Sequence, residues 1–153
     1  MSILLAVIRP DGWNWALLLH VAGAMILVGG LLTAGAALLL AGRDATGTLA
    51  RFSYLTLAAV AFPGFVLMRA GAAWIYDKEG FGSSNDPTWV GIGFATADGG
   101  GPLLLIALIV GGVGLSRARR GTGGRLLRAS GVIALVLLVF YVVTVWAMAA
   151  KPS

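Results

Sequence analysis

Long apolar stretches alternate with short polar ones along the chain, and this pattern predicts four membrane-spanning helices. A helix of about 20 apolar residues is long enough to cross the hydrocarbon core of a bilayer. Stretches of this kind cover residues 15–41, 52–76, 102–116 and 129–150. We therefore expect an all-α, polytopic membrane protein in which residues 1–153 form a single membrane domain, a four-transmembrane-helix bundle.

The third stretch, 102–116, is short for a hydrocarbon core of about 30 Å. Before it, residues 89–94 are apolar within a connection that is otherwise polar and rich in glycine. Two interpretations of residues 88–98 are open. They form an outer interfacial or re-entrant segment, followed by a hinge at 98–102, or they lengthen the third helix.

The composition agrees with a membrane protein and limits the chemistry. Of the 153 residues, 59% are hydrophobic and only 11% are charged, whereas a soluble domain has about 25% charged residues. The chain has no cysteine, which excludes disulfides and thiolate metal sites. Four spans leave no room for a separate catalytic domain, so we assign no catalytic residue and no metal site.

The charges of the connecting segments predict the orientation, because cytoplasmic loops retain Lys and Arg. Residues 117–128 carry five arginines and no acid, and residues 43–51 carry two arginines and one acid. Residues 77–98 carry four acids against one lysine. We expect both termini outside. The net charge of +5 then reflects this asymmetry, and no nucleic-acid partner is expected.

Small residues recur at heptad spacing on two spans, which predicts the faces that pack inside the bundle. On the first span this face comprises His20, Gly23, Leu27, Gly30, Ala34, Ala37 and Ala41. On the fourth it comprises Ser130, Ala134, Leu137, Tyr141, Thr144 and Met148.

Four polar side chains from three spans fall at similar depth. At a rise of about 1.5 Å per residue, His20, Arg69, Tyr141 and Thr144 all lie roughly 8–15 Å from the outer helix ends. Ionisable residues inside a membrane need a partner or a water-filled cavity, so they mark a candidate cofactor-binding site. The alternative is structural: Arg69 reaches the outer headgroups or pairs with Asp77, and His20 makes an interhelical hydrogen bond.

The cofactor itself is unknown, and three ligands fit these residue types. A b-type haem would use His20 as axial ligand, with Arg69 on a propionate and Met25, Met68 or Met148 in the sixth position. An anionic or quinone-like ligand would meet Arg69, with His20 and Tyr141 as hydrogen-bonding groups. Copper would use His20 and a methionine. Transport by the chain alone is disfavoured, because none of the four predicted spans contains an acidic residue.

Several strings resemble an uncharacterised bacterial family of four-helix integral membrane proteins. They are Leu18-Leu-His-Val-Ala-Gly-Ala-Met-Ile-Leu-Val-Gly-Gly30, Lys78-Glu-Gly80, Asp86-Pro-Thr-Trp-Val-Gly-Ile-Gly-Phe94 and Val145-Trp-Ala-Met-Ala-Ala-Lys-Pro152. The resemblance implies a bacterial inner (plasma) membrane protein and no established activity. The first helix is also weakly similar to the copper resistance protein D membrane domain, from which only His20 carries over.

These observations lead to two expected functions. The first is a non-enzymatic membrane protein, packed in the lipid bilayer as a homo-oligomer or as a small accessory subunit with other membrane subunits. The alternative is an electron-transfer subunit that binds a b-type haem or a lipophilic cofactor through His20.

Overall fold

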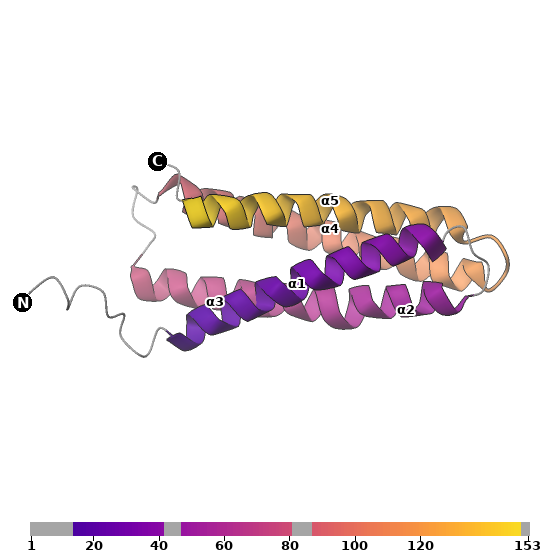
Figure 1. Ribbon diagram of the computed structural model, residues 1–153, viewed down its shortest axis with the longest axis horizontal. Helices are drawn as coiled ribbons and strands as arrows, with labels where there is room; N and C mark the ends of the chain where they lie inside the picture. Colours follow the sequence, from indigo (N-terminus) through magenta and orange to yellow (C-terminus); the bar gives the residue numbers. More distant parts are fainter. Residues whose placement is uncertain (1–13, 42–46, 81–86, 151–153) are drawn as a thin grey trace, which may run out of the picture.

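The computed structural model describes residues 14–41, 47–80 and 87–150, and within these ranges it is almost entirely helical (Figure 1). The elements are α1 (Asn14–Ala41), α2 (Thr48–Thr56), η2 (Leu57–Ala61), α3 (Phe62–Glu79), α4 (Thr88–Ala118) and α5 (Gly124–Ala150). Because α2, η2 and α3 follow one another without a break, they form one helical rod. The described part of the chain is therefore a bundle of four rods, each long and apolar enough to cross a membrane.

The second rod contains a turn of π-helix where the sequence has a proline. Residues 57–61 form η2, and Pro63 stands in the first turn of α3. Proline lacks an N–H and its ring crowds the carbonyl four residues earlier, so a wider turn before it relieves the clash. The rod therefore passes Pro63 without ending, as expected for the second span, and extends to residues 48–79.

The third rod decides between the two interpretations of residues 88–98. α4 runs unbroken through residues 88–118 with Pro102 inside it, so residues 88–98 lengthen the third helix and form no separate interfacial or re-entrant segment. The expected hinge at 98–102 is wrong. A Cβ on Gly100 would lie 3.0 Å from Tyr141 Cζ, and one on Gly101 would lie 3.0 Å from Phe65 Cζ. These glycines make room for aromatic rings instead of bending the chain.

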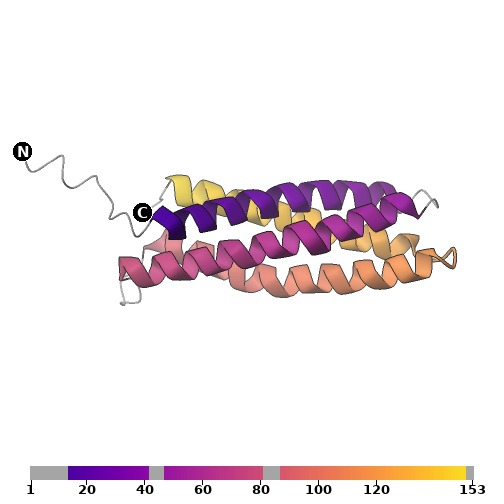
Figure 2. The ribbon, with the colours of Figure 1, turned by 90° about the horizontal axis from the view of Figure 1, so that it is seen from below.

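The four rods are arranged in the order α3, α1, α5, α4 around the bundle (Figure 2). α1 packs extensively on α3 and on α5, and α4 packs extensively on α5. The fourth side differs, because α3 and α4 scarcely touch. Figure 1 shows α3 diverging from α4 and α5 towards the end of the bundle where α1 begins, which we call the Asn14 end. The opposite end, where α1 finishes, we call the Ala41 end.

Glycines allow α1 and α3 to cross at backbone contact. A Cβ on Gly23 would lie 2.8 Å from Met68 Cα, one on Gly64 would lie 2.6 Å from the Leu27 nitrogen, and one on Gly71 would lie 2.7 Å from His20 Cα. Small residues at such crossings bring helices close enough for van der Waals attraction between backbones, which drives helix association in membranes. We call these three positions the glycine seam.

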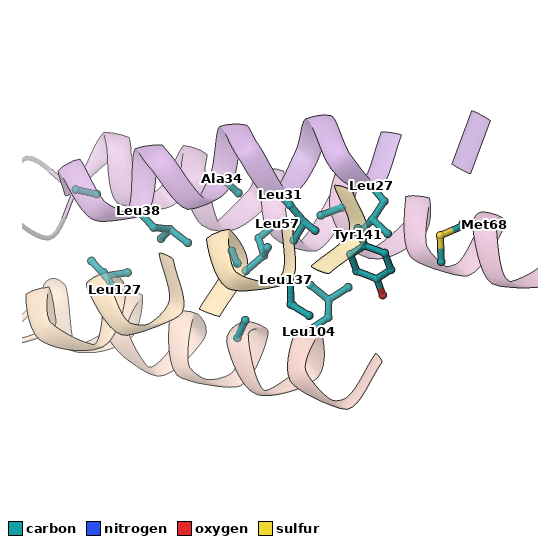
Figure 3. Close-up of a cluster of buried hydrophobic side chains, with 14 of the residues drawn as sticks. Leu27, Leu31, Ala34, Leu38, Leu57, Met68, Leu104, Leu127, Leu137 and Tyr141 are labelled. Atoms are coloured by element: carbon teal, nitrogen blue, oxygen red, sulfur yellow. The ribbon is translucent and has the colours of Figure 1, made fainter. Parts of the chain in front are cut away.

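Leucines from all four rods fill the centre of the bundle (Figure 3). Most of the predicted inward faces are confirmed, since Gly23, Leu27, Gly30, Ala34 and Ala41 of α1 are buried. Leu38 is buried where Ala37 was expected, because a straight helix repeats every 3.6 residues and drifts from a heptad. On α5 every predicted residue from Ser130 to Thr144 is buried, and only Met148 is partly exposed.

Candidate ligand-binding cavity

A cavity of about 770 Å³ lies at the Asn14 end, between the first part of α1, the last part of α3, the first part of α4 and the last part of α5. Its volume is within the range of about 300–1,000 Å³ that is typical of small-molecule sites. The walls are mainly Leu, Val, Ala and Met side chains. His20, Arg69, Tyr141 and Thr144, the four residues selected from the sequence, all line it.

The leucine core does not extend into this region. In Figure 3 the buried leucines occupy the middle of the bundle, and Tyr141 and Met68 stand at the edge of the cluster towards the Asn14 end. The cavity is therefore a part of the bundle that the side chains of residues 14–41, 47–80 and 87–150 leave unfilled.

His20 is held by the glycine seam. Because Gly71 has no side chain, α1 approaches α3 at His20, and His20 Nδ1 lies 2.9 Å from the Met68 carbonyl oxygen. A carbonyl oxygen only accepts, so Nδ1 carries the proton and donates it. In the neutral ring Nε2 is then an acceptor, the arrangement found in histidines that ligate metals or accept a ligand hydroxyl.

Arg69 has a polar partner that the sequence did not suggest. Its Nη2 donates to Asp98 Oδ1 at 2.9 Å, forming an ion pair between α3 and α4. The guanidinium also lies over the Phe94 ring, with Cζ 4.7 Å from the ring centroid. Phe94 in turn makes an edge-to-face contact with Tyr76, with the two ring centroids 4.9 Å apart. These contacts, which we call the α3–α4 clasp, cross the sparsely packed side of the bundle.

The clasp follows from helix periodicity. Arg69 and Tyr76 are separated by seven residues and Phe94 and Asp98 by four, so each pair shares one face of its helix. The Arg69 side chain lines the cavity and is 33% exposed, whereas that of Asp98 does not line it and is 63% exposed, so the ion pair lies at the surface of the bundle and not in the depth of the cavity.

Tyr141 presents an unpartnered hydroxyl. The residue is 3% exposed, lines the cavity, and its Oη is buried without a hydrogen-bond partner among the described residues. A buried hydroxyl left unpaired costs roughly 1–3 kcal/mol. Its position against Gly100 is fixed by packing, since a Cβ there would collide with Oη. The hydroxyl is therefore packed against α4 at the wall of the cavity, with almost no accessible surface of its own.

The Thr144 hydroxyl is already engaged. Thr144 Oγ1 lies 2.9 Å from the Phe140 carbonyl oxygen and 2.8 Å from Thr96 Oγ1. A hydroxyl has one proton and a carbonyl only accepts, so Thr144 donates to Phe140 and Thr96 donates to Thr144. Thr144 thus links α5 to α4 at the cavity wall, and its proton is not free for a ligand.

Asp98 was not predicted as a site residue, because the sequence around it is typical of a loop. The glycines and Pro102 that follow Asp98 are typical of a chain break. The statement that the spans contain no acidic residue is wrong for the same reason, since α4 includes Asp98. The spacing of Phe94 and Asp98 on one helical face, opposite a lone arginine in the preceding span, was the available signal.

Among the described residues, no group of three or more His, Cys, Asp and Glu side chains is placed to hold a metal ion. Comparison of the chain with protein-family models, with curated proteins and with solved structures finds no match. The cavity and its four polar residues are therefore the basis for a functional conclusion.

Proposed function

We propose that the protein is a multi-pass membrane protein that binds a lipophilic molecule in the cavity at the Asn14 end. The observation that carries this proposal is an apolar volume of about 770 Å³ that is lined by only a few polar side chains, among them His20 and Arg69. Apolar walls with few polar groups are typical of sites that orient an amphiphilic ligand. The function is binding, and it requires no catalytic residue.

The sparse α3–α4 side supports access from the lipid phase. Helices α1, α3, α4 and α5 line the cavity, and of their neighbouring pairs α3 and α4 make by far the fewest contacts. A molecule dissolved in the bilayer would reach the cavity sideways between α3 and α4, past the clasp. This route needs no passage through water, which suits a ligand of low solubility.

We propose that the Asn14 end faces the outside of a bacterial plasma membrane, as the loop charges indicate. Ser84→Cys, a position outside the described residues, is expected to react with a membrane-impermeant thiol reagent in intact cells. Thr122→Cys, in the arginine-rich connection at the Ala41 end, is expected to stay unlabelled until the cells are lysed. The chain has no cysteine, so the protein without an introduced cysteine gives no labelling. The reverse labelling pattern would overturn this orientation.

Ligand binding is tested by native mass spectrometry of the protein purified in mild detergent. We expect a species heavier than the protein by a hydrophobic molecule that organic extraction releases. Ala72→Trp, which places a large ring on the cavity wall, should abolish this species. Ala70→Trp is the matched control, because Ala70 is exposed and does not line the cavity. Equal occupancy in both variants, or no bound molecule in the wild type, would contradict the proposal.

The same preparation separates the remaining alternatives. A homo-oligomer or a complex with other membrane subunits, as expected from the stripes of small residues, would be read from the measured mass. A b-type haem would give a Soret band in the visible spectrum that His20→Ala removes. The protonated Nδ1 of His20, which leaves Nε2 as an acceptor, is the observation that favours this second candidate.

A further inference from the structure

We propose that a groove between α1 and α5 at the Ala41 end binds one anionic phospholipid, with the lipid phosphate on Arg128 and an acyl chain along the apolar wall. This site is separate from the cavity at the Asn14 end. It rests on the proposed membrane location of the protein and not on a ligand in the cavity.

The groove has a volume of about 410 Å³ and lies on the outer surface of the bundle. Four of its five lining side chains are apolar, and the fifth is an arginine. They are Ala36, Leu39 and Leu40 of α1 and Arg128 and Leu135 of α5. Because Ala36, Leu40 and Arg128 are exposed, the groove opens to the surroundings of the bundle and is no part of the leucine core.

The groove follows from the way in which α1 and α5 cross. A Cβ on Gly35 would lie 2.8 Å from Leu135 Cδ2, and one on Gly131 would lie 2.9 Å from the Gly35 carbonyl oxygen. These glycines bring the two backbones into contact. The next residue of α1 is Ala36, whose side chain is a single carbon, so the space beside the crossing stays open.

Charged and apolar groups follow one another along the groove as they do along a phospholipid. Helix α5 has 27 residues, so it is about 40 Å long and exceeds a hydrocarbon core of about 30 Å by roughly 5 Å at each end. Arg128 lies about 6 Å and Leu135 about 16 Å from the start of α5 at Gly124. The arginine is therefore at the depth of the lipid head groups, and the apolar wall extends from it towards the middle of the membrane.

The charge at the Ala41 end favours an anion. The connecting segments there carry seven arginines, two in residues 43–51 and five in residues 117–128, against the single acid Asp44. Arg125 and Arg128 also stand near the N-terminus of α5, where the helix dipole is positive and favours a negative charge. An arginine binds phosphate through two parallel N–H···O bonds. A lipid phosphate would therefore offset both the surplus charge and the dipole.

Binding is measured by native mass spectrometry of delipidated protein in mild detergent, titrated with dioleoylphosphatidylglycerol or dioleoylphosphatidylcholine. The two lipids have equal acyl chains, but the choline brings a positive charge to the arginine-rich end. We expect the first phosphatidylglycerol to bind at least tenfold more tightly than phosphatidylcholine. Equal affinities would overturn the proposal.

Arg128→Gln tests the phosphate contact. A hydrogen bond to a charged group is strong enough that its loss should weaken the first phosphatidylglycerol by about tenfold or more. Arg119→Gln is the matched control, because it removes the same charge at the same end of the bundle from an exposed residue that does not line the groove. It should change the affinity less than twofold. Equal weakening in both variants would show a general attraction to the arginine-rich end and would overturn the site.

Ala36→Trp tests the apolar part, since the ring would occupy the groove and should weaken phosphatidylglycerol about tenfold. Thr33→Trp, at an exposed residue of α1 that does not line the groove, should leave the affinity unchanged. Equal affinities of these two variants would contradict an acyl chain in the groove. Glycerol phosphate should not displace the lipid, and displacement would show a site for free phosphate instead.

The groove and the cavity are tested separately. Ala72→Trp, on the cavity wall, should leave phosphatidylglycerol binding unchanged, and Ala36→Trp should leave the cavity ligand bound. Loss of the cavity ligand alone would therefore concern the proposed function and not the groove. Weakening of phosphatidylglycerol by Ala72→Trp would place the lipid in the cavity and overturn the groove site.

Discussion

Gly23→Ala is expected to lower the thermal stability of the protein markedly, whereas Gly29→Ala on the same helix should leave it unchanged or raise it. A Cβ on Gly23 would lie 2.8 Å from Met68 Cα, a backbone atom that cannot move without separating α1 from α3. Overpacking of this kind costs about 1–3 kcal/mol. A Cβ on Gly29 meets no atom within 4 Å, so there only the gain in helix propensity of about 1 kcal/mol remains.

The two variants are compared by thermal unfolding in one detergent. Because both replace glycine by alanine in α1, their difference isolates the contact with α3 from any change in helix propensity. Equal melting temperatures would show that the glycine seam is not a close backbone contact in solution.

Arg69 and Asp98 are expected to be energetically coupled by more than about 1 kcal/mol, above the mean of about 0.6 kcal/mol for polar contacts between membrane helices. In Arg69→Gln the Asp98 carboxylate loses its partner, and in Asp98→Asn the guanidinium loses its own. Each single change should therefore destabilise the protein, and the double change should cost less than their sum. The measurement is a double-mutant cycle of unfolding free energies.

A second cycle that combines Arg69→Gln with His20→Ala is the control. Arg69 and His20 line the same cavity, but His20 donates to the Met68 carbonyl and Arg69 donates to Asp98. We therefore expect the second cycle to be additive within about 0.5 kcal/mol. Stronger coupling of Arg69 to His20 than to Asp98 would contradict the clasp.

The bundle could be predicted from the sequence because the apolar stretches are long and the small residues recur at regular spacing. Apolar stretches identified four helices, and small-residue stripes identified most of the buried faces of α1 and α5. The four residues chosen from depth alone line one cavity, since equal depth on inward faces brings side chains together. Depth does not fix rotation about a helix axis, however, so the partners of these residues could not be derived.

The length of α4 was the main error, and its cause is physical. In water, a helix would be expected to break at Gly99, Gly100, Gly101 and Pro102, because the exposed backbone can form hydrogen bonds with water instead. In a bundle, a helix tolerates them when neighbouring side chains fill the space above the glycines, as Tyr141 and Phe65 do here. That compensation lies on other helices and is not visible in the local sequence.

The α3–α4 clasp also has a consequence for biogenesis. A lone arginine or aspartate at the centre of a helix raises the cost of membrane insertion by about 2.5–3.5 kcal/mol, and α3 and α4 each carry one such charge in the clasp. These helices are consecutive, so the two charges can meet before either helix is released into lipid. We therefore expect α3 and α4 to leave the translocon as a hairpin already joined by Arg69 and Asp98, and not as two helices inserted one after the other.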